Sequence, residues 1–163
     1  MQRLRLEVYR IYSEVLLSTG RKIQAVNIIK NQIVFYESFR NSNEYSAIIS
    51  NDKLSQYKDT NQTLPDLYHQ IILLFTDLKD QENYKKYSLE SLKLCKILEK
   101  NSLNDQCYRI NMSILRGLNT FEANLFSKDQ IVEIIDSVDL HYYEFENNVN
   151  YKNYSKKTQA RFK

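Results

Sequence analysis

Glycine and proline are almost absent from this chain of 163 residues, which contains two glycines and one proline. Glycine supplies the positive φ angles of tight β-hairpins and of phosphate-binding loops. A chain with so little of it cannot build glycine-rich nucleotide sites or many sharp turns. This scarcity favours helices joined by short connections.

The spacing of apolar residues supports the same conclusion. Apolar side chains recur every three or four residues, which is typical of amphipathic helices, and no segment shows the alternation of a β-strand. We expect an all-α fold of six or seven helices. The expected ranges are 3–19, 23–40, 44–57, 64–78, 84–100, 108–121 and 128–142, of which 44–57 has the weakest periodicity.

Three short segments carry signals for helix ends. Gly20 follows the first apolar stripe, where glycine commonly ends a helix. Thr63 with Pro65 predicts a helix start, with Thr63 as the N-cap and Pro65 in the first turn. Ser127 with Gln130 matches a capping box.

Gly117 is different because it lies inside a predicted helix. A glycine there lowers helix stability, unless it allows another element to approach closely. We expect one of these two consequences at this position.

Charge divides the chain into two parts. All 20 acidic residues lie at or before Glu146, together with 18 of the 23 basic ones, so residues 1–146 carry a net charge of −2. The remaining five basic residues follow Glu146 without an acid, which accounts for the overall +3. We therefore expect a helical repeat domain over 1–146 and a basic C-terminal segment over 147–163.

The cysteines and the hydropathy of the chain indicate in which cellular compartment it is found. Cys95 and Cys107 lack the Cys-x-x-Cys spacing of redox or metal sites, which predicts buried free thiols in a reducing compartment. No stretch approaches the roughly 18 apolar residues of a membrane span, and the first residues lack a secretory signal. We expect a cytoplasmic protein with no membrane association.

Catalytic motifs are absent. Helical ribonucleases of the HEPN type place an arginine four to six residues before a histidine, and neither His69 nor His141 has one. Asp66 with His69 is a single copy of an acid-x-x-His pattern that di-iron bundles use twice. Glu133 and Asp136 share a helix face that could hold a cation or a basic peptide, or could simply be solvated. We expect no enzyme activity, no cofactor and no metal.

Two stretches resemble the tetratricopeptide repeat, a helical hairpin of about 34 residues. The matching positions are Tyr9, Tyr12, Leu16, Gly20, Ala25 and Ile29 in the first stretch, and Ile71, Leu74, Phe75, Leu78, Tyr84 and Leu94 in the second. The resemblance covers about 70 of the 163 residues, and Tyr87 departs from it where the family has alanine. It implies a right-handed stack of antiparallel hairpins whose concave face binds a peptide or a protein.

The resemblance and the 13 tyrosines together suggest which residues make that contact. Tyrosine is favoured at binding surfaces because it adds contact area at little entropic cost. It can equally replace phenylalanine at the edge of a core. The residues expected to bind a peptide or protein are Arg10, Asn27 and Lys30 in the first hairpin, and Tyr68, Tyr84 and Tyr87 in the second.

The C-terminal segment suggests an alternative function. It interleaves aromatic and basic residues, as proteins that bind single-stranded nucleic acid do. These residues are Tyr151, Lys152, Tyr154, Lys156, Lys157 and Arg161. The same pattern also suits a short amphipathic helix docked on the preceding hairpin. We therefore expect a peptide-binding or protein-binding module, such as the sensor or scaffold part of a larger regulatory protein, with nucleic-acid binding and self-association as alternatives.

Overall fold

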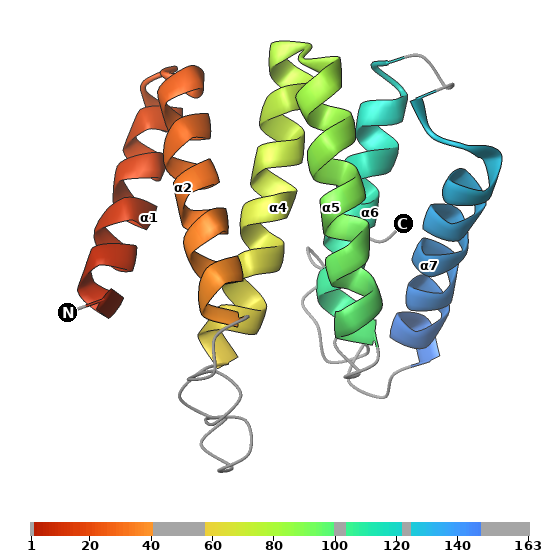
Figure 1. Ribbon diagram of the computed structural model, residues 1–163. Helices are drawn as coiled ribbons and strands as arrows, with labels where there is room; N and C mark the ends of the chain where they lie inside the picture. The colour runs from red at the N-terminus through yellow and green to blue at the C-terminus, as the bar shows by residue number, and fades with distance from the viewer. Residues whose placement is uncertain (1, 41–57, 100–103, 122–124, 148–163) are drawn as a thin grey trace.

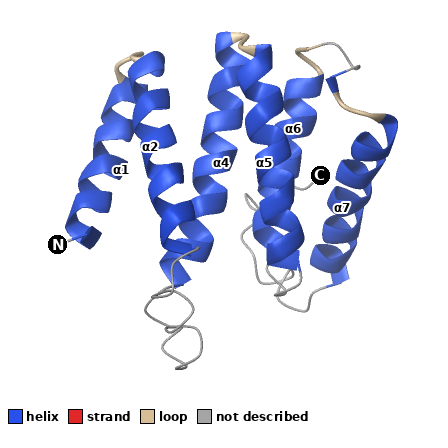
Figure 2. Ribbon diagram, in the orientation of Figure 1, coloured by secondary structure: helices blue, strands red, loops and turns tan. Residues whose placement is uncertain are grey.

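The computed structural model describes residues 2–40, 58–99, 104–121 and 125–147, with side chains over 8–38, 64–97, 107–121 and 125–138. This part of the chain is helical and contains no strand, which confirms the all-α prediction (Figure 2). The predicted helix over 44–57 and the tail beyond residue 147 lie outside the described residues. Over the described ranges, no helix combines the length and the apolar character that crossing a membrane requires.

Six helices make up the described residues. They are α1 (Gln2–Ser18), α2 (Lys22–Arg40), α4 (Lys58–Leu78), α5 (Gln81–Glu99), α6 (Asn104–Leu118) and α7 (Lys128–Asn147). Figure 1 shows them side by side in a row that begins with α1 and ends with α7. Helix α4 is central and packs against α2, α5 and α6, whereas α1 packs against α2 and α7 packs against α6.

Gly20 ends α1 as predicted. Its φ of 75° is the left-handed conformation that glycine adopts without strain. The amide of Gly20 donates to Leu17 O at 3.1 Å, and the amide of Arg21 donates to Leu16 O at 2.8 Å. These two bonds form a Schellman motif, which satisfies the last carbonyls of the helix and reverses the chain into α2.

The turn between α4 and α5 has the same hydrogen bonds without a glycine. Lys79 has a φ of 55°, its amide donates to Thr76 O, and the amide of Asp80 donates to Phe75 O. Asp80 then caps α5, because its Oδ1 accepts from the Asn83 amide at 3.1 Å. The sequence gives no glycine signal at this turn.

The predicted start of α4 is wrong. The helix begins at Lys58, so Thr63 is not its N-cap and Pro65 lies inside the helix. An interior proline removes one backbone hydrogen bond and costs about 3 kcal/mol. Leu64 and Leu67 beside it are buried, and full burial of a leucine side chain is worth about 1.5–3 kcal/mol, which offsets that cost.

The capping box of α7 is confirmed. The Ser127 amide donates to Gln130 Oε1 at 3.0 Å, and the Gln130 amide donates to Ser127 Oγ at 3.2 Å. Cys95 and Cys107 are also as expected, since both are buried and neither forms a disulfide.

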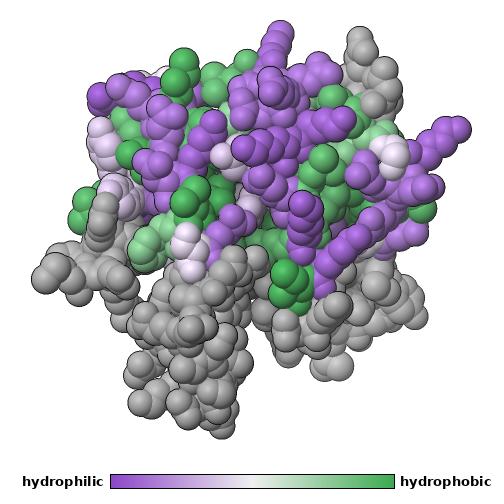
Figure 3. All heavy atoms as spheres, in the orientation of Figure 1, coloured by the Kyte–Doolittle hydropathy of each residue, from purple (hydrophilic) through white to green (hydrophobic). Residues whose placement is uncertain are grey.

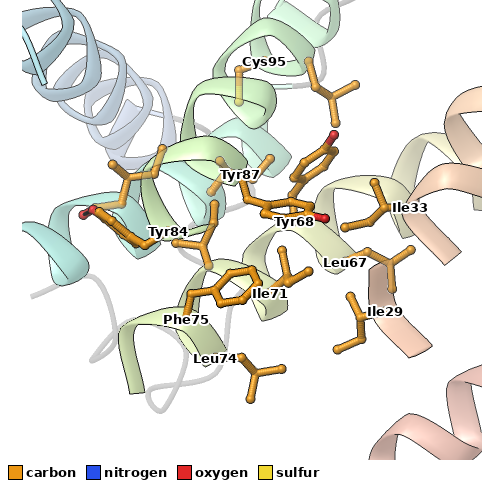
Figure 4. Packing of buried hydrophobic residues seen from close by; sticks show 14 of the residues in the cluster. Ile29, Ile33, Leu67, Tyr68, Ile71, Leu74, Phe75, Tyr84, Tyr87 and Cys95 are labelled. Carbon is orange, nitrogen blue, oxygen red and sulfur yellow. Dashed lines mark hydrogen bonds between the residues drawn. The ribbon is translucent and has the colours of Figure 1, made fainter. Parts of the chain in front are cut away.

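The core lies along α4 and its neighbours. In Figure 4, Ile29 and Ile33 of α2 approach Leu67 of α4, while Tyr87 of α5 lies over the α4 side chains. Cys107, Ile110 and Ile114 of α6 and Ile134 of α7 extend the same cluster. One hydrophobic cluster therefore connects the row from α2 to α7.

Helix α1 buries less of its apolar stripe than the periodicity suggests. Leu16 is fully buried, but Val8, Ile11, Tyr12 and Val15 are each 45–56 % exposed. The reason is that α1 is the end of the row and packs mainly on one neighbour. Elsewhere, on the face shown in Figure 3, hydrophobic side chains lie in separate areas among hydrophilic ones.

Candidate functional site

The structure places two of the predicted contact residues on the surface, apart from the others. Arg10 is exposed on α1 and pairs with Glu14 through Nη1 and Oε1 at 2.8 Å. Asn27 is exposed on α2. Neither belongs to a cluster with the predicted tyrosines.

Lys30, Tyr68 and Tyr87 do come together, between α2, α4 and α5. Lys30 Nζ lies 5.2 Å from the ring centroid of Phe75 and 5.7 Å from that of Tyr87, within the range of a cation–π interaction. The Tyr87 ring stacks on Phe75 with centroids 5.4 Å apart and lies 6.3 Å from the Tyr68 ring (Figure 4). The sequence alone did not predict that these three helices bring Lys30, Tyr68 and Tyr87 into contact.

This cluster is closed rather than open to a partner. Tyr68 is fully buried and its hydroxyl donates to Glu37 Oε1 at 2.6 Å, while Tyr87 is only 8 % exposed. Burial, followed by the charges of Glu90 and Glu37, raises the pKa of Tyr87. The Tyr68 ring is therefore core and Tyr87 offers a partner little surface, and their contact with a peptide stays a prediction.

Tyr84 is also a core residue, and its place in a binding groove stays a prediction. Its ring is fully buried, 4.8 Å from the ring of Phe121 and 6.1 Å from that of Phe126. Its hydroxyl donates to Ile114 O at 2.5 Å, and burial raises the pKa of the phenol well above its usual 10. The predicted nucleic-acid contacts at 151–161 lie outside the described residues.

A second cluster lies on the opposite side of α4, where it meets α6. We call it the α4–α6 surface and define it by Asp66 and His69 of α4 and by Arg109, Met112 and Arg116 of α6. The spacing of three and four residues puts Arg109, Met112 and Arg116 on one face of α6. All three are exposed, Met112 by 43 %.

Polar contacts hold this surface together. Arg109 Nη1 pairs with Asp66 Oδ1, and both side chains are about half exposed. His69 Nδ1 lies 2.5 Å from Ser113 Oγ and 3.2 Å from Arg109 O. Two residues of α4 therefore contact two residues of α6 that follow some 43 positions later in the chain.

The surroundings of His69 disfavour its charged form. Burial and then the charge of Arg109 lower its pKa, with a smaller contribution in the same direction from Arg116, and the hydrogen bond to Arg109 O and the charge of Asp66 oppose them. Ser113 is only 2 % exposed and its hydroxyl donates to Arg109 O at 2.8 Å. The serine beside His69 is thus a link between helices, since a nucleophile needs access to substrate.

The acidic residues Glu133 and Asp136 have no third metal-ligating side chain beside them among the described residues. Glu133 Oε1 pairs with Lys96 Nζ at 2.8 Å, which ties α7 to α5. No group of three metal-ligating side chains occurs among the residues whose side chains are described.

Sequence reasoning missed Arg109, Met112 and Arg116 as site residues. The available signal was a basic-apolar-basic stripe on one face of a short helix, which is common on solvated helices. It noted Asp66 and His69 only as an isolated acid and histidine.

Comparison with known proteins adds no assignment: no protein-family model, no curated protein and no solved structure matches this chain. The likeness to tetratricopeptide repeats therefore stays a prediction from the sequence.

Proposed function

We propose that this chain is a helical-repeat module of the tetratricopeptide type and that its α4–α6 surface binds a peptide or a segment of another protein. The observation that carries the proposal is the exposed side chain of Met112 between Arg109 and Arg116, beside Asp66 and His69 of the neighbouring helix. This arrangement presents apolar and charged groups together on two packed helices.

The helix order supports this choice of surface. The first helix of one pair, α4, packs directly on the first helix of the next, α6. In stacked hairpins such a shared surface is extended and suits a peptide chain. On the opposite side of α4, Tyr68 and Tyr87 are buried, so that side has less exposed surface for a ligand.

The charges indicate the kind of segment. Arg109 is shared with Asp66, whereas Arg116 forms none of the ion pairs of the described side chains. A guanidinium with donors to spare binds carboxylates well, and methionine adapts to varied apolar side chains. The expected ligand is a peptide with an acidic residue next to an apolar one.

Selection from a library of displayed random peptides tests this proposal. Peptides would be selected on the full chain, and the best one measured by fluorescence anisotropy against wild type and Arg116→Glu. Reversal of this charge should weaken binding by about tenfold or more, because it replaces attraction by repulsion at the contact. Selected sequences should be enriched in Asp or Glu beside an apolar residue.

The control is Lys85→Glu, the same charge reversal at an exposed position of α5. It should bind the selected peptide as wild type does. An equal loss of peptide affinity in both variants would show that binding depends only on the net charge of the chain. Failure to enrich any peptide, or unchanged binding by Arg116→Glu, would refute the proposed surface.

A further inference from the structure

The outer side of α1 is an apolar face without a neighbour in the row. Val8, Ile11, Tyr12 and Val15 are 56, 53, 47 and 45 % exposed, and their spacing places them in one stripe along the helix. Leu16, which is fully buried, lies on the side that packs on α2. The end helices of repeat arrays are usually polar on the outside, because no further repeat covers them.

Helix α7, at the other end, also exposes apolar side chains. Ile134 is fully buried where α7 packs against α6, whereas Val132 and Ile135 are 54 and 42 % exposed. Helices α1 and α7 lie at the two ends of the row (Figure 1), so both ends present exposed apolar residues.

The two end helices differ in charge. The range Gln2–Ser18 contains three arginines and two glutamates, a net charge of +1. The range Lys128–Asn147 contains six acidic residues and one lysine, a net charge of −5. Opposite charges favour contact between α1 and α7, and like charges disfavour contact between two copies of α7.

The packing inside the chain shows how such a contact would be made. Each later pair of helices places its first helix on the last helix of the pair before it: α4 packs on α2, and α6 packs on α5. If α1 of a second copy packed on α7, it would repeat this relationship and continue the row.

From these observations we propose that the chain associates head to tail with further copies of itself, through the outer faces of α1 (Val8, Ile11, Tyr12, Val15) and α7 (Val132, Ile135). The two contacting faces are different, so the interface is heterologous and each copy keeps one free end. Association then continues beyond a dimer, into rings or open rows.

Sedimentation velocity of the full chain at rising concentration tests the proposal, with two variants that each block one end. Ile11→Glu places a carboxylate in the α1 face, and Val132→Glu places one in the α7 face. Both residues are about half exposed, so neither change removes a core contact. Burying an unpaired carboxylate in an apolar contact is costly, so each variant alone should stay at the monomer mass of 19.5 kDa.

The decisive sample is an equimolar mixture of the two variants. Ile11→Glu keeps an intact α7 face and Val132→Glu keeps an intact α1 face, so the mixture should reach twice the monomer mass and stop there. Wild type should pass through that mass and continue to larger species. Val34→Glu, at an exposed apolar position of α2, is the matched control and should associate as wild type does.

Three results would overturn the proposal. Wild type could remain a monomer at all concentrations, in which case the end faces are free or serve a different partner. Val132→Glu alone could still form dimers while Ile11→Glu does not, which would indicate symmetric pairing of two α1 helices. Finally, Val34→Glu could abolish association as well, which would place the contact elsewhere.

Discussion

The ring of Tyr84 fills the space beside Gly117 that a β-carbon would occupy. A Cβ built on Gly117 would overlap the ring and lie 2.7 Å from the phenol oxygen, and the Tyr84 hydroxyl donates to Ile114 O on the preceding turn of α6. Because Gly117 has no β-carbon, the Tyr84 ring of α5 can pack directly against the backbone of α6.

Gly117→Ala should destabilise the fold despite the better helix propensity of alanine. The propensity gain is at most about 1 kcal/mol, whereas overpacking a filled core costs about 1–3 kcal/mol. Urea denaturation should show a net loss of stability. The control is the same substitution in a Tyr84→Leu background, where the ring is gone and alanine should be neutral or stabilising. Equal effects in both backgrounds would mean that the ring does not impose the glycine.

Tyr84→Phe should change how stability depends on alkaline pH. Burial raises the pKa of Tyr84 in the folded state above its ordinary value of 10, so above that pH the unfolded state ionises first and wild type loses stability as the pH rises. At neutral pH the variant should be less stable by about 1 kcal/mol, because Ile114 O loses its donor. The deficit should shrink in urea titrations at pH 10 and above, and a constant deficit would contradict the assignment.

His69→Gln should flatten the acid side of the stability profile. The pKa of His69 is lowered from 6.5 by burial and by the charge of Arg109, so the unfolded state binds the proton more readily. The stabilisation is complete above pH 6.5 and is lost as the pH falls. Denaturation at pH 5–8 should show a smaller fall for the variant. Direct titration of the His69 ring by NMR provides the check, since a pKa at or above 6.5 would refute the prediction.

Lys79→Gly should stabilise the turn between α4 and α5. Lys79 has a φ of 55°, and the left-handed conformation costs a residue with a β-carbon about 1 kcal/mol. The exposed lysine side chain makes no ion pair with any described residue, so little is lost. Thermal unfolding should show a higher Tm. Lys85→Gly, within α5, is the comparison and should lower it, because glycine inside a helix is unfavourable.

The helices and most of their ends could be predicted because their causes are local. The three-and-four spacing determines a helix, Gly20 supplies the left-handed residue that ends α1, and Ser127 with Gln130 caps α7 within four residues. The prediction failed at Pro65, where a local start signal was outweighed by burial of neighbouring residues against other helices.

The candidate site depended on neighbours that are distant in sequence. Helical periodicity tells which side chains share a face, but not which element lies opposite that face. Tyr68 and Tyr84 could equally have lined a groove until α2 and α6 were seen to cover them. Likewise, Asp66 and His69 acquire a role only beside Arg109 of α6.

The sequence by itself determined that this chain is helical, where most helices end, and that its two cysteines form no disulfide with each other. The tertiary structure decided which apolar stripes are buried, which tyrosines are core, and which charged residues meet on one surface. The physical reason is that helix formation rests on hydrogen bonds and contacts within a few residues, whereas burial is a property of how separate helices pack.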